Sequence, residues 1–87
     1  MPQISRFFGI VIYMYAKDHL PPHFHAIYGD DEAIIDIRTK EITEGNLSKR
    51  AQRLVKEWAE LHEQELLANF EEAQKPQPQF KPIAPLD

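Results

Sequence analysis

One stretch of this chain, residues 47–73, repeats its apolar side chains with the period of an α-helix. Asn46 or Ser48 is placed to cap its start, and Pro76 prevents a helix from continuing. We therefore predict a helix over about residues 48–74. A straight helix of that length would span about 40 Å, more than a small sheet needs, so we allow a break near Leu61–His62. The repeating apolar residues are Leu47, Ala51, Leu54, Val55, Trp58, Leu61, Leu66, Phe70 and Ala73.

A helix with one apolar stripe needs a surface to cover, and the first half of the chain offers strands. Residues 7–15, 23–28 and 33–38 are rich in β-branched and aromatic side chains. We predict an α+β fold in which these three strands form an antiparallel meander and one long C-terminal helix covers one face. We assign residues 1–75 to a single domain. Residues 76–87 hold four prolines and are predicted to be an extended tail.

The composition excludes several classes of protein. The 87 residues suit one small domain, and the absence of cysteine excludes a disulfide framework and a thiolate metal site. The net charge of −4 argues against a basic nucleic-acid-binding domain. No apolar run reaches the roughly 18 residues of a membrane helix. We therefore expect a cytoplasmic protein that does not contact a membrane.

Matching the apolar faces of the second and third predicted strands gives an expected register. A turn around Asp30–Asp31 would bring these faces together under the helix. On the opposite, outer face, the same register would place His25 beside Asp36 and His23 beside Arg38. The outer face is therefore where we expect a polar site.

Three histidines occur within seven residues, and His23 and His25 project from the same face of a predicted strand. An aspartate beside a histidine fixes its tautomer, and arginine binds phosphate through a planar fork. We predict His23, His25, His19 and Asp36 as catalytic residues for acid–base cleavage of an RNA phosphodiester. The candidate phosphate-binding residues are Arg38, Arg6, Lys49, Arg50 and Arg53.

Other roles for this outer face stay open. His23 and His25, with either His19 or Asp18, have the donor atoms for a divalent metal, although our leading prediction needs no cofactor. The face could also be a solvated polar surface with no role in chemistry. A further hypothesis is a non-enzymatic protein-interaction module that binds its partner through Phe7, Val11, Tyr13, Tyr15 and Ile27.

Three segments of the chain carry a family resemblance. They are the opening Pro2-Gln3-Ile4-Ser5-Arg6-Phe7-Phe8-Gly9-Ile10, the histidine segment from Asp18 to Gly29, and Trp58-Ala59-Glu60-Leu61-His62 with Glu65-Leu66. They resemble the domain-of-unknown-function family numbered 4160, and the resemblance covers roughly residues 2–75. Asp18, His19, His23 and His25 match the family pattern, but the resemblance supplies no established active site.

The resemblance implies a small bacterial protein, often encoded beside a second small protein of the domain-of-unknown-function family numbered 2442. Some of these pairs are assigned as type II toxin–antitoxin modules, with this family as the toxin side. The resemblance therefore implies a cognate antitoxin-like small protein as a partner. Our leading hypothesis is a toxin-like protein that acts on RNA through the histidine face.

Overall fold

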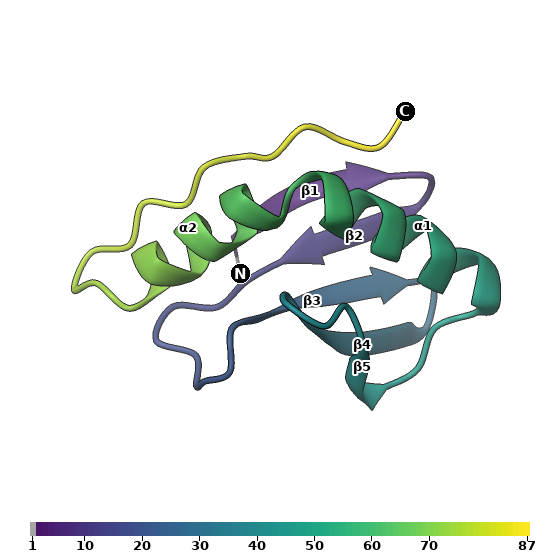
Figure 1. Cartoon of the computed structure of the whole chain (residues 1–87), viewed down its shortest axis with the longest axis horizontal. Coiled ribbons are helices and arrows are strands. Elements are labelled where there is room, and N and C mark those ends of the chain that lie inside the picture. The colour runs from purple at the N-terminus through teal and green to yellow at the C-terminus, as the bar shows by residue number, and fades with distance from the viewer. Residues whose placement is uncertain (1) are drawn as a thin grey trace.

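Five strands form one antiparallel sheet, and two helices cover one of its faces (Figure 1). The computed structural model describes residues 2–87. Neighbouring strands follow one another in chain order, so the predicted meander is present, with five strands in place of three. The elements are β1 (Gln3–Phe7), β2 (Ile10–Tyr13), β3 (His23–Tyr28), β4 (Asp31–Asp36), β5 (Ile42–Gly45), α1 (Lys49–Leu61) and α2 (Glu63–Ala73).

The first predicted strand is in fact two strands joined by a tight turn, so the prediction of one strand over residues 7–15 was wrong. Phe8 and Gly9 both have a positive φ, of 49° and 81°. Two successive residues with positive φ are what a type I′ hairpin turn requires, and this turn suits the twist of antiparallel strands. It places Phe7 opposite Ile10 and leaves the Phe8 side chain about half exposed.

The hairpin of β3 and β4 has a register two residues away from the predicted one. The turn lies one residue earlier than expected, at Gly29–Asp30, so His23 pairs with Asp36 and His25 with Ile34. A shift of two residues leaves every side chain on its predicted face, because the side-chain period of a strand is two. The predicted pairs of His25 with Asp36 and of His23 with Arg38 were therefore wrong, but the shared face of the two histidines is present.

The predicted long helix is divided at His62. This residue has φ −123°, and α1 ends directly before it while α2 begins directly after it. The prediction of a single helix over residues 48–74 was therefore wrong. The break lies near Leu61–His62, where the excess length led us to allow one. Ser48 caps α1 by accepting a hydrogen bond from the backbone N–H of Ala51.

The core lies between the sheet and the helices and centres on Trp58. The Trp58 ring is fully buried, with its centroid 5.2 Å from that of Phe7 and 5.8 Å from that of Phe24. Phe7 was predicted on the outer face, but the extra hairpin turns it inward, so that prediction was wrong. The other core side chains include Ile10, Ile12, Met14, Ala26, Ile35, Ile37, Leu47, Ala51, Val55, Leu66 and Phe70.

The proline-rich tail packs along the domain beside β1 and the helices (Figure 1). The backbone N–H of Ile83 donates to the carbonyl of Ile4, and the indole N–H of Trp58 donates to the carbonyl of Ala84. Ile83 and Leu86 are buried in the same cluster as the rest of the core. The tail thus covers the outer edge of the sheet at β1.

Candidate functional site

The loop between β2 and β3, residues 14–22, brings Asp18 against the histidines of β3. The backbone N–H of Lys17 donates to the carbonyl of Ala73 at 2.6 Å. The side-chain amide of Gln74 donates to the carbonyl of Asp18 at 3.0 Å. Because both bonds reach the end of α2, the helix layer helps to fix the position of this loop.

One carboxylate oxygen contacts both histidines of β3. Asp18 Oδ2 lies 2.9 Å from His23 Nε2 and 3.1 Å from His25 Nε2. These three atoms lie within 4.8 Å of one another. His23 is 4% exposed and His25 is 8% exposed, so both imidazoles are buried although they project from the outer face. We call these residues the Asp18–His23–His25 cluster.

Asp18 is held in its ionised form. Its partial burial raises the pKa, but hydrogen bonds from His25 and His23, and from the backbone N–H of His19, outweigh the burial. The pKa of Asp18 therefore lies below its ordinary value of 3.8. The cluster accordingly contains a carboxylate with its negative charge directed at two imidazoles.

The second ring nitrogen of His23 determines where its hydrogen lies. His23 Nδ1 is 2.8 Å from the carbonyl oxygen of Pro21, which can only accept, so Nδ1 carries a hydrogen. In a neutral imidazole, Nε2 then presents a lone pair to the carboxylate of Asp18. Two electron-rich atoms at that distance require a cation between them, which is either a second proton on His23 or a metal ion.

His25 packs against two tyrosine rings and has one unpaired nitrogen. Its ring centroid lies 5.7 Å from that of Tyr13, in a parallel stack, and 4.5 Å from that of Tyr15, edge-on. His25 Nδ1 is buried and has no hydrogen-bond partner among residues 2–87. The carboxylate of Glu32 approaches it to 3.7 Å, which is too far for a hydrogen bond.

Glu32 is in contact with Tyr13, whose hydroxyl donates a hydrogen bond to Glu32 Oε2 at 3.2 Å. Burial, the hydrogen bond with Tyr15 and the charge of Glu32 together raise the pKa of Tyr13. The Tyr13 hydroxyl therefore keeps the proton that it donates. The result is a chain of polar groups that runs from Tyr13 through Glu32 toward His25.

His19 lies beside the cluster and not within it. Its side chain is 79% exposed, and its Nε2 is 4.0 Å from Asp18 Oδ1. Its ring centroid is 5.1 Å from that of His23. The structure thus brings His19 near the other two histidines, but with its nitrogens outside the group of converging atoms.

Asp36, the fourth predicted catalytic residue, has a structural role in this arrangement. It pairs with His23 in the β3–β4 ladder. Its Oδ1 accepts hydrogen bonds from the backbone N–H groups of Arg38 and Thr39, at 2.8 and 2.9 Å. The Asp36 carboxylate therefore stabilises the turn that follows β4.

The predicted phosphate-binding residues are spread over the molecule. Arg38 lines a groove against α2, and Arg6 lies on β1, which β2 separates from β3. Lys49, Arg50 and Arg53 are exposed on α1, on the helix side of the sheet. By contrast, the two pockets that adjoin the cluster are lined by acidic residues and by no lysine or arginine. The acidic residues are Asp36, Glu44 and Glu32.

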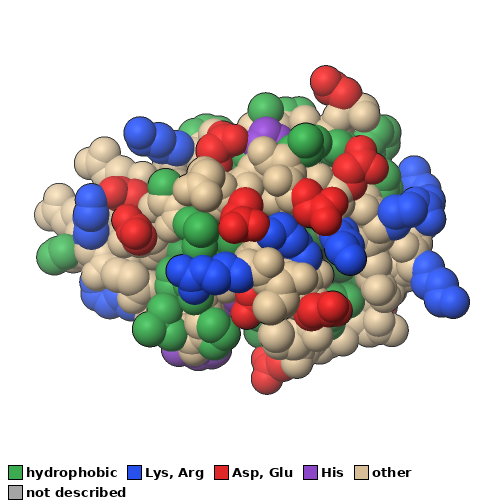
Figure 2. Space-filling view, in the orientation of Figure 1, with side chains coloured by type: hydrophobic (Ala, Val, Ile, Leu, Met, Phe, Trp, Pro, Cys, Tyr) green, Lys and Arg blue, Asp and Glu red, His purple; other side chains and the backbone are tan. Residues whose placement is uncertain are grey.

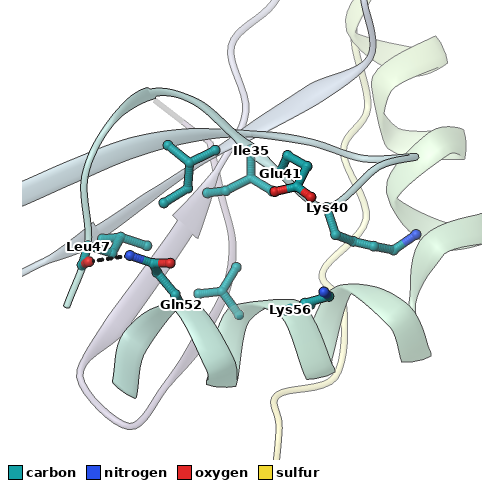
Figure 3. Close-up of a pocket in the computed structure, with 8 residues that line it drawn as sticks. Ile35, Lys40, Glu41, Leu47, Gln52 and Lys56 are labelled. Atoms are coloured by element: carbon teal, nitrogen blue, oxygen red, sulfur yellow. Dashed lines mark hydrogen bonds between the residues drawn. The ribbon is translucent and has the colours of Figure 1, made fainter. Parts of the chain in front are cut away.

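The helix-covered face offers a different kind of site. Acidic and basic side chains are mixed on it, and histidine shows only in small areas near its edges (Figure 2). A pocket opens there between α1 and the segment before β5, with Lys40 and Lys56 at one end and Leu47 and Gln52 at the other (Figure 3). The Lys40 ammonium is paired with Glu63. The residues that line this pocket include no histidine, so it holds no counterpart of the histidine cluster.

Sequence reasoning gave Asp18 only as an alternative metal ligand, and it missed Glu32. A signal for Asp18 was present, because it precedes His23 by five residues on a loop stiffened by two prolines. Glu32 had no local signal. It approaches His25 only because Glu32 pairs with Ile27, the residue two positions after His25 on β3.

The fold and the cluster define a small α+β domain with a histidine–carboxylate site on the outer face of a five-stranded meander. A family profile described as "Domain of unknown function (DUF4160)" matches residues 9–71, so the chain belongs to this family, as its resemblance indicated. Neither the curated proteins nor the solved structures contain a match to the chain. Within residues 2–87, no helix is both long and apolar enough to cross a membrane.

Proposed function

We propose that this protein binds a divalent transition-metal ion through Asp18, His23 and His25. The observation that carries the proposal is the convergence of one carboxylate oxygen and two Nε2 atoms, at separations of 2.9 and 3.1 Å. In a tetrahedral site with bonds of about 2.0–2.1 Å, neighbouring ligand atoms lie about 3.3 Å apart. The two distances from Asp18 to the imidazoles would therefore need to lengthen by only a few tenths of an ångström for an ion to lie between these atoms.

The hydrogen bond at the far side of His23 also supports this role. Histidines that bind metals usually donate their other ring N–H to a carbonyl or carboxylate, which directs the remaining lone pair at the ion. His23 Nδ1 makes such a bond with the carbonyl of Pro21. A metal ion would also separate the Nε2 lone pair from the Asp18 carboxylate, which removes the need for a buried imidazolium.

Two histidines and one carboxylate form a donor set typical of open zinc and ferrous iron sites. Such a set leaves coordination positions for water or a small ligand, and a bound ion would lower the pKa of that water. The acidic lining of the two adjoining pockets favours the approach of a cation. The same lining opposes a negatively charged substrate.

Metal binding can be tested on the full chain purified without a histidine tag. We expect about one equivalent of metal by elemental analysis, or on titration of the chelator-stripped protein with zinc, cobalt(II), ferrous iron or manganese. Saturating metal should raise the Tm, because an ion that binds only the folded state stabilises it. The proposal is wrong if none of these ions binds or changes the Tm.

Two single-histidine variants make this test specific. His23→Ala should abolish the tight binding, since it removes a buried ligand. His19→Ala should bind nearly as tightly as the wild type, since the His19 nitrogens lie outside the cluster. Equal losses in both variants would favour a ligand set that includes His19 and would contradict the assignment of Asp18.

A toxin-like function on RNA is the second candidate, and it rests on what the family resemblance implies, because the matched family is described only as a domain of unknown function. The resemblance implies a type II toxin–antitoxin module with an antitoxin-like partner. Acid–base chemistry by His23 and His25 would require their nitrogens to reach the substrate, whereas both Nε2 atoms face Asp18. Asp18 would have to move aside, or a metal-bound water would have to supply the base.

This second candidate predicts that induced expression arrests growth and cleaves RNA. The double variant His23→Ala/His25→Ala should lose both effects, and circular dichroism should show that it remains folded. Unchanged arrest by a folded double variant would remove the cluster from the toxin function. Metal binding by the wild type without any growth arrest would leave the metal site in place and argue against the toxin.

A further inference from the structure

We infer that Glu32 is a positioning residue for the metal centre, because its carboxylate lies 3.7 Å from His25 Nδ1, a small rotation away from accepting a hydrogen bond from it. This inference rests on the proposed metal-binding function and deepens it. It assigns a role to a residue that has none in the ligand set. It also accounts for the unpaired nitrogen of His25.

The hydrogen on His25 must occupy a different nitrogen when a metal ion is bound. In the absence of metal, a hydrogen on Nε2 satisfies the contact with Asp18 Oδ2. When Nε2 donates its lone pair to an ion, that hydrogen must leave Nε2. The neutral imidazole then carries its one hydrogen on Nδ1, so the ring changes tautomer without a net gain or loss of protons.

The new N–H at His25 Nδ1 requires a hydrogen-bond acceptor. His25 is 8% exposed, so water cannot readily satisfy Nδ1, and a buried donor without an acceptor is unfavourable. Glu32 Oε2 lies 3.7 Å from Nδ1. The Glu32 side chain is 51% exposed, which leaves it free to rotate by the small amount needed for a hydrogen bond.

Tyr13 contacts both Glu32 and His25. The Tyr13 hydroxyl donates to the same Oε2 atom, while the Tyr13 ring stacks parallel to His25. Tyr13 and His25 are directly paired across β2 and β3. One tyrosine therefore holds both the imidazole and the carboxylate. A carboxylate behind a metal-bound histidine raises the basicity of the ligand and fixes its orientation.

The test compares Glu32→Gln with Glu44→Gln in the full chain. Both substitutions remove one negative charge, and both residues line the pocket beside His25. We expect Glu32→Gln to weaken zinc binding about 10- to 100-fold in a chelator competition assay, because a neutral amide oxygen accepts a weaker hydrogen bond than a carboxylate does. Glu44→Gln should change the affinity by less than about threefold, since only the general charge is lost.

A spectroscopic measurement separates positioning from a general structural effect. The ¹⁵N chemical shifts of His25 should show a hydrogen on Nδ1 in the zinc-bound wild type, protected from exchange. In Glu32→Gln this hydrogen should exchange faster, while the Tm of the metal-free protein stays near that of the wild type. Tyr13→Phe should weaken zinc binding by a smaller factor, because the carboxylate remains.

The outcomes distinguish the two proposals. Wild-type affinity in Glu32→Gln, or equal losses in Glu32→Gln and Glu44→Gln, would overturn the role of Glu32 and leave the metal centre intact. A hydrogen on Nε2 of His25 in the zinc-bound protein would also overturn it. If the wild type binds none of the four ions, the metal function and the role of Glu32 are both wrong.

Discussion

His23 Nε2 lies 2.9 Å from Asp18 Oδ2, although the histidine is on a strand and the aspartate is on a loop that is bonded to the end of α2. The Nδ1 of the same imidazole is occupied by the Pro21 carbonyl. The pair therefore depends on a cation that is either a proton or a metal ion. Each of these cations has a measurable consequence for binding or for stability.

Asp18→Asn should weaken metal binding most clearly. Asparagine keeps the size of the side chain, but it removes the negative charge and offers a weaker ligand. The loss of an outer-shell contact usually lowers metal affinity about 10- to 100-fold. We expect Asp18→Asn to lower the affinity for zinc by more than this. Calorimetric titration of the stripped protein measures the change.

Asp30→Asn is a suitable control for that variant. Asp30 is exposed in the turn between β3 and β4, so the substitution makes the same change in net charge far from any ligand role. Its affinity for zinc should equal that of the wild type. A similar loss in both variants would mean that binding follows net charge, and that Asp18 is not a ligand.

The lowered pKa of Asp18 also predicts how stability depends on acid in the metal-free protein. A group whose pKa is lower in the folded state binds fewer protons there, so its contribution is present above its unfolded pKa. The contribution is lost as the pH falls through the lowered, folded value. If Asp18 is the only group considered, the unfolding free energies of the wild type and Asp18→Asn should therefore differ by a constant amount above pH 3.8. Below this pH the two free energies should converge.

Urea unfolding at a series of pH values between about 2 and 6 measures this difference. The comparison is made at each pH between the two proteins, and not across pH for one of them. A difference that grows as the pH falls would contradict the ionised form of Asp18.

The strand faces could be predicted from the sequence because they depend only on a period of two. His23 and His25 share the outer face in the structure, as alternation required. The partners across the strands could not be predicted, because they depend on which residues form the turn. Because the turn is at Gly29–Asp30, every pair across β3 and β4 differs by two positions from the predicted pair. Glu32 lies near His25 only in the observed register.

The extra strands were missed for a related reason. Phe8 is not a residue that usually signals a turn, and its positive φ is rare for a bulky side chain. A single glycine within an apolar run is also compatible with a bulge in one strand, so Gly9 alone does not identify a turn. β5 carries only one partly buried residue, Ile42, so its alternation is too weak to mark a strand. By contrast, Ser48 and the helical period were local signals, and both predicted the start of α1.

Gly45→Ala should disturb the fold and the site together. Gly45 has φ 77°, and a Cβ there would overlap the backbone carbonyl oxygen of Glu32. The substitution must push β5 away from β4, and it should also displace Glu32. We expect a clear loss of stability and a weaker affinity for zinc, measured by urea unfolding and by titration.

Gly29→Ala separates backbone strain from this overlap. Gly29 has a similar φ of 63°, but a Cβ there would meet no atom within 4 Å. A left-handed conformation costs an alanine about 1 kcal/mol. Gly29→Ala should therefore lower the unfolding free energy by only this amount and leave the zinc affinity unchanged. Equal effects at the two glycines would show that the close approach of Gly45 to Glu32 has no consequence for the site.

Ile83→Ala tests whether the tail is part of the folded domain. Ile83 is 4% exposed, and its backbone N–H bonds to Ile4. Truncation of a buried isoleucine usually costs about 2–5 kcal/mol of unfolding free energy, and the proline-rich tail is less constrained than an internal strand, so we expect about 2–3 kcal/mol.

Gln77→Ala, at an exposed position of the same tail, should cost less than about 0.5 kcal/mol. Equally small costs for both variants, measured by urea unfolding, would mean that the tail separates from the core in solution. The Trp58 indole, which bonds to Ala84, would then be left exposed, and its fluorescence would report the separation.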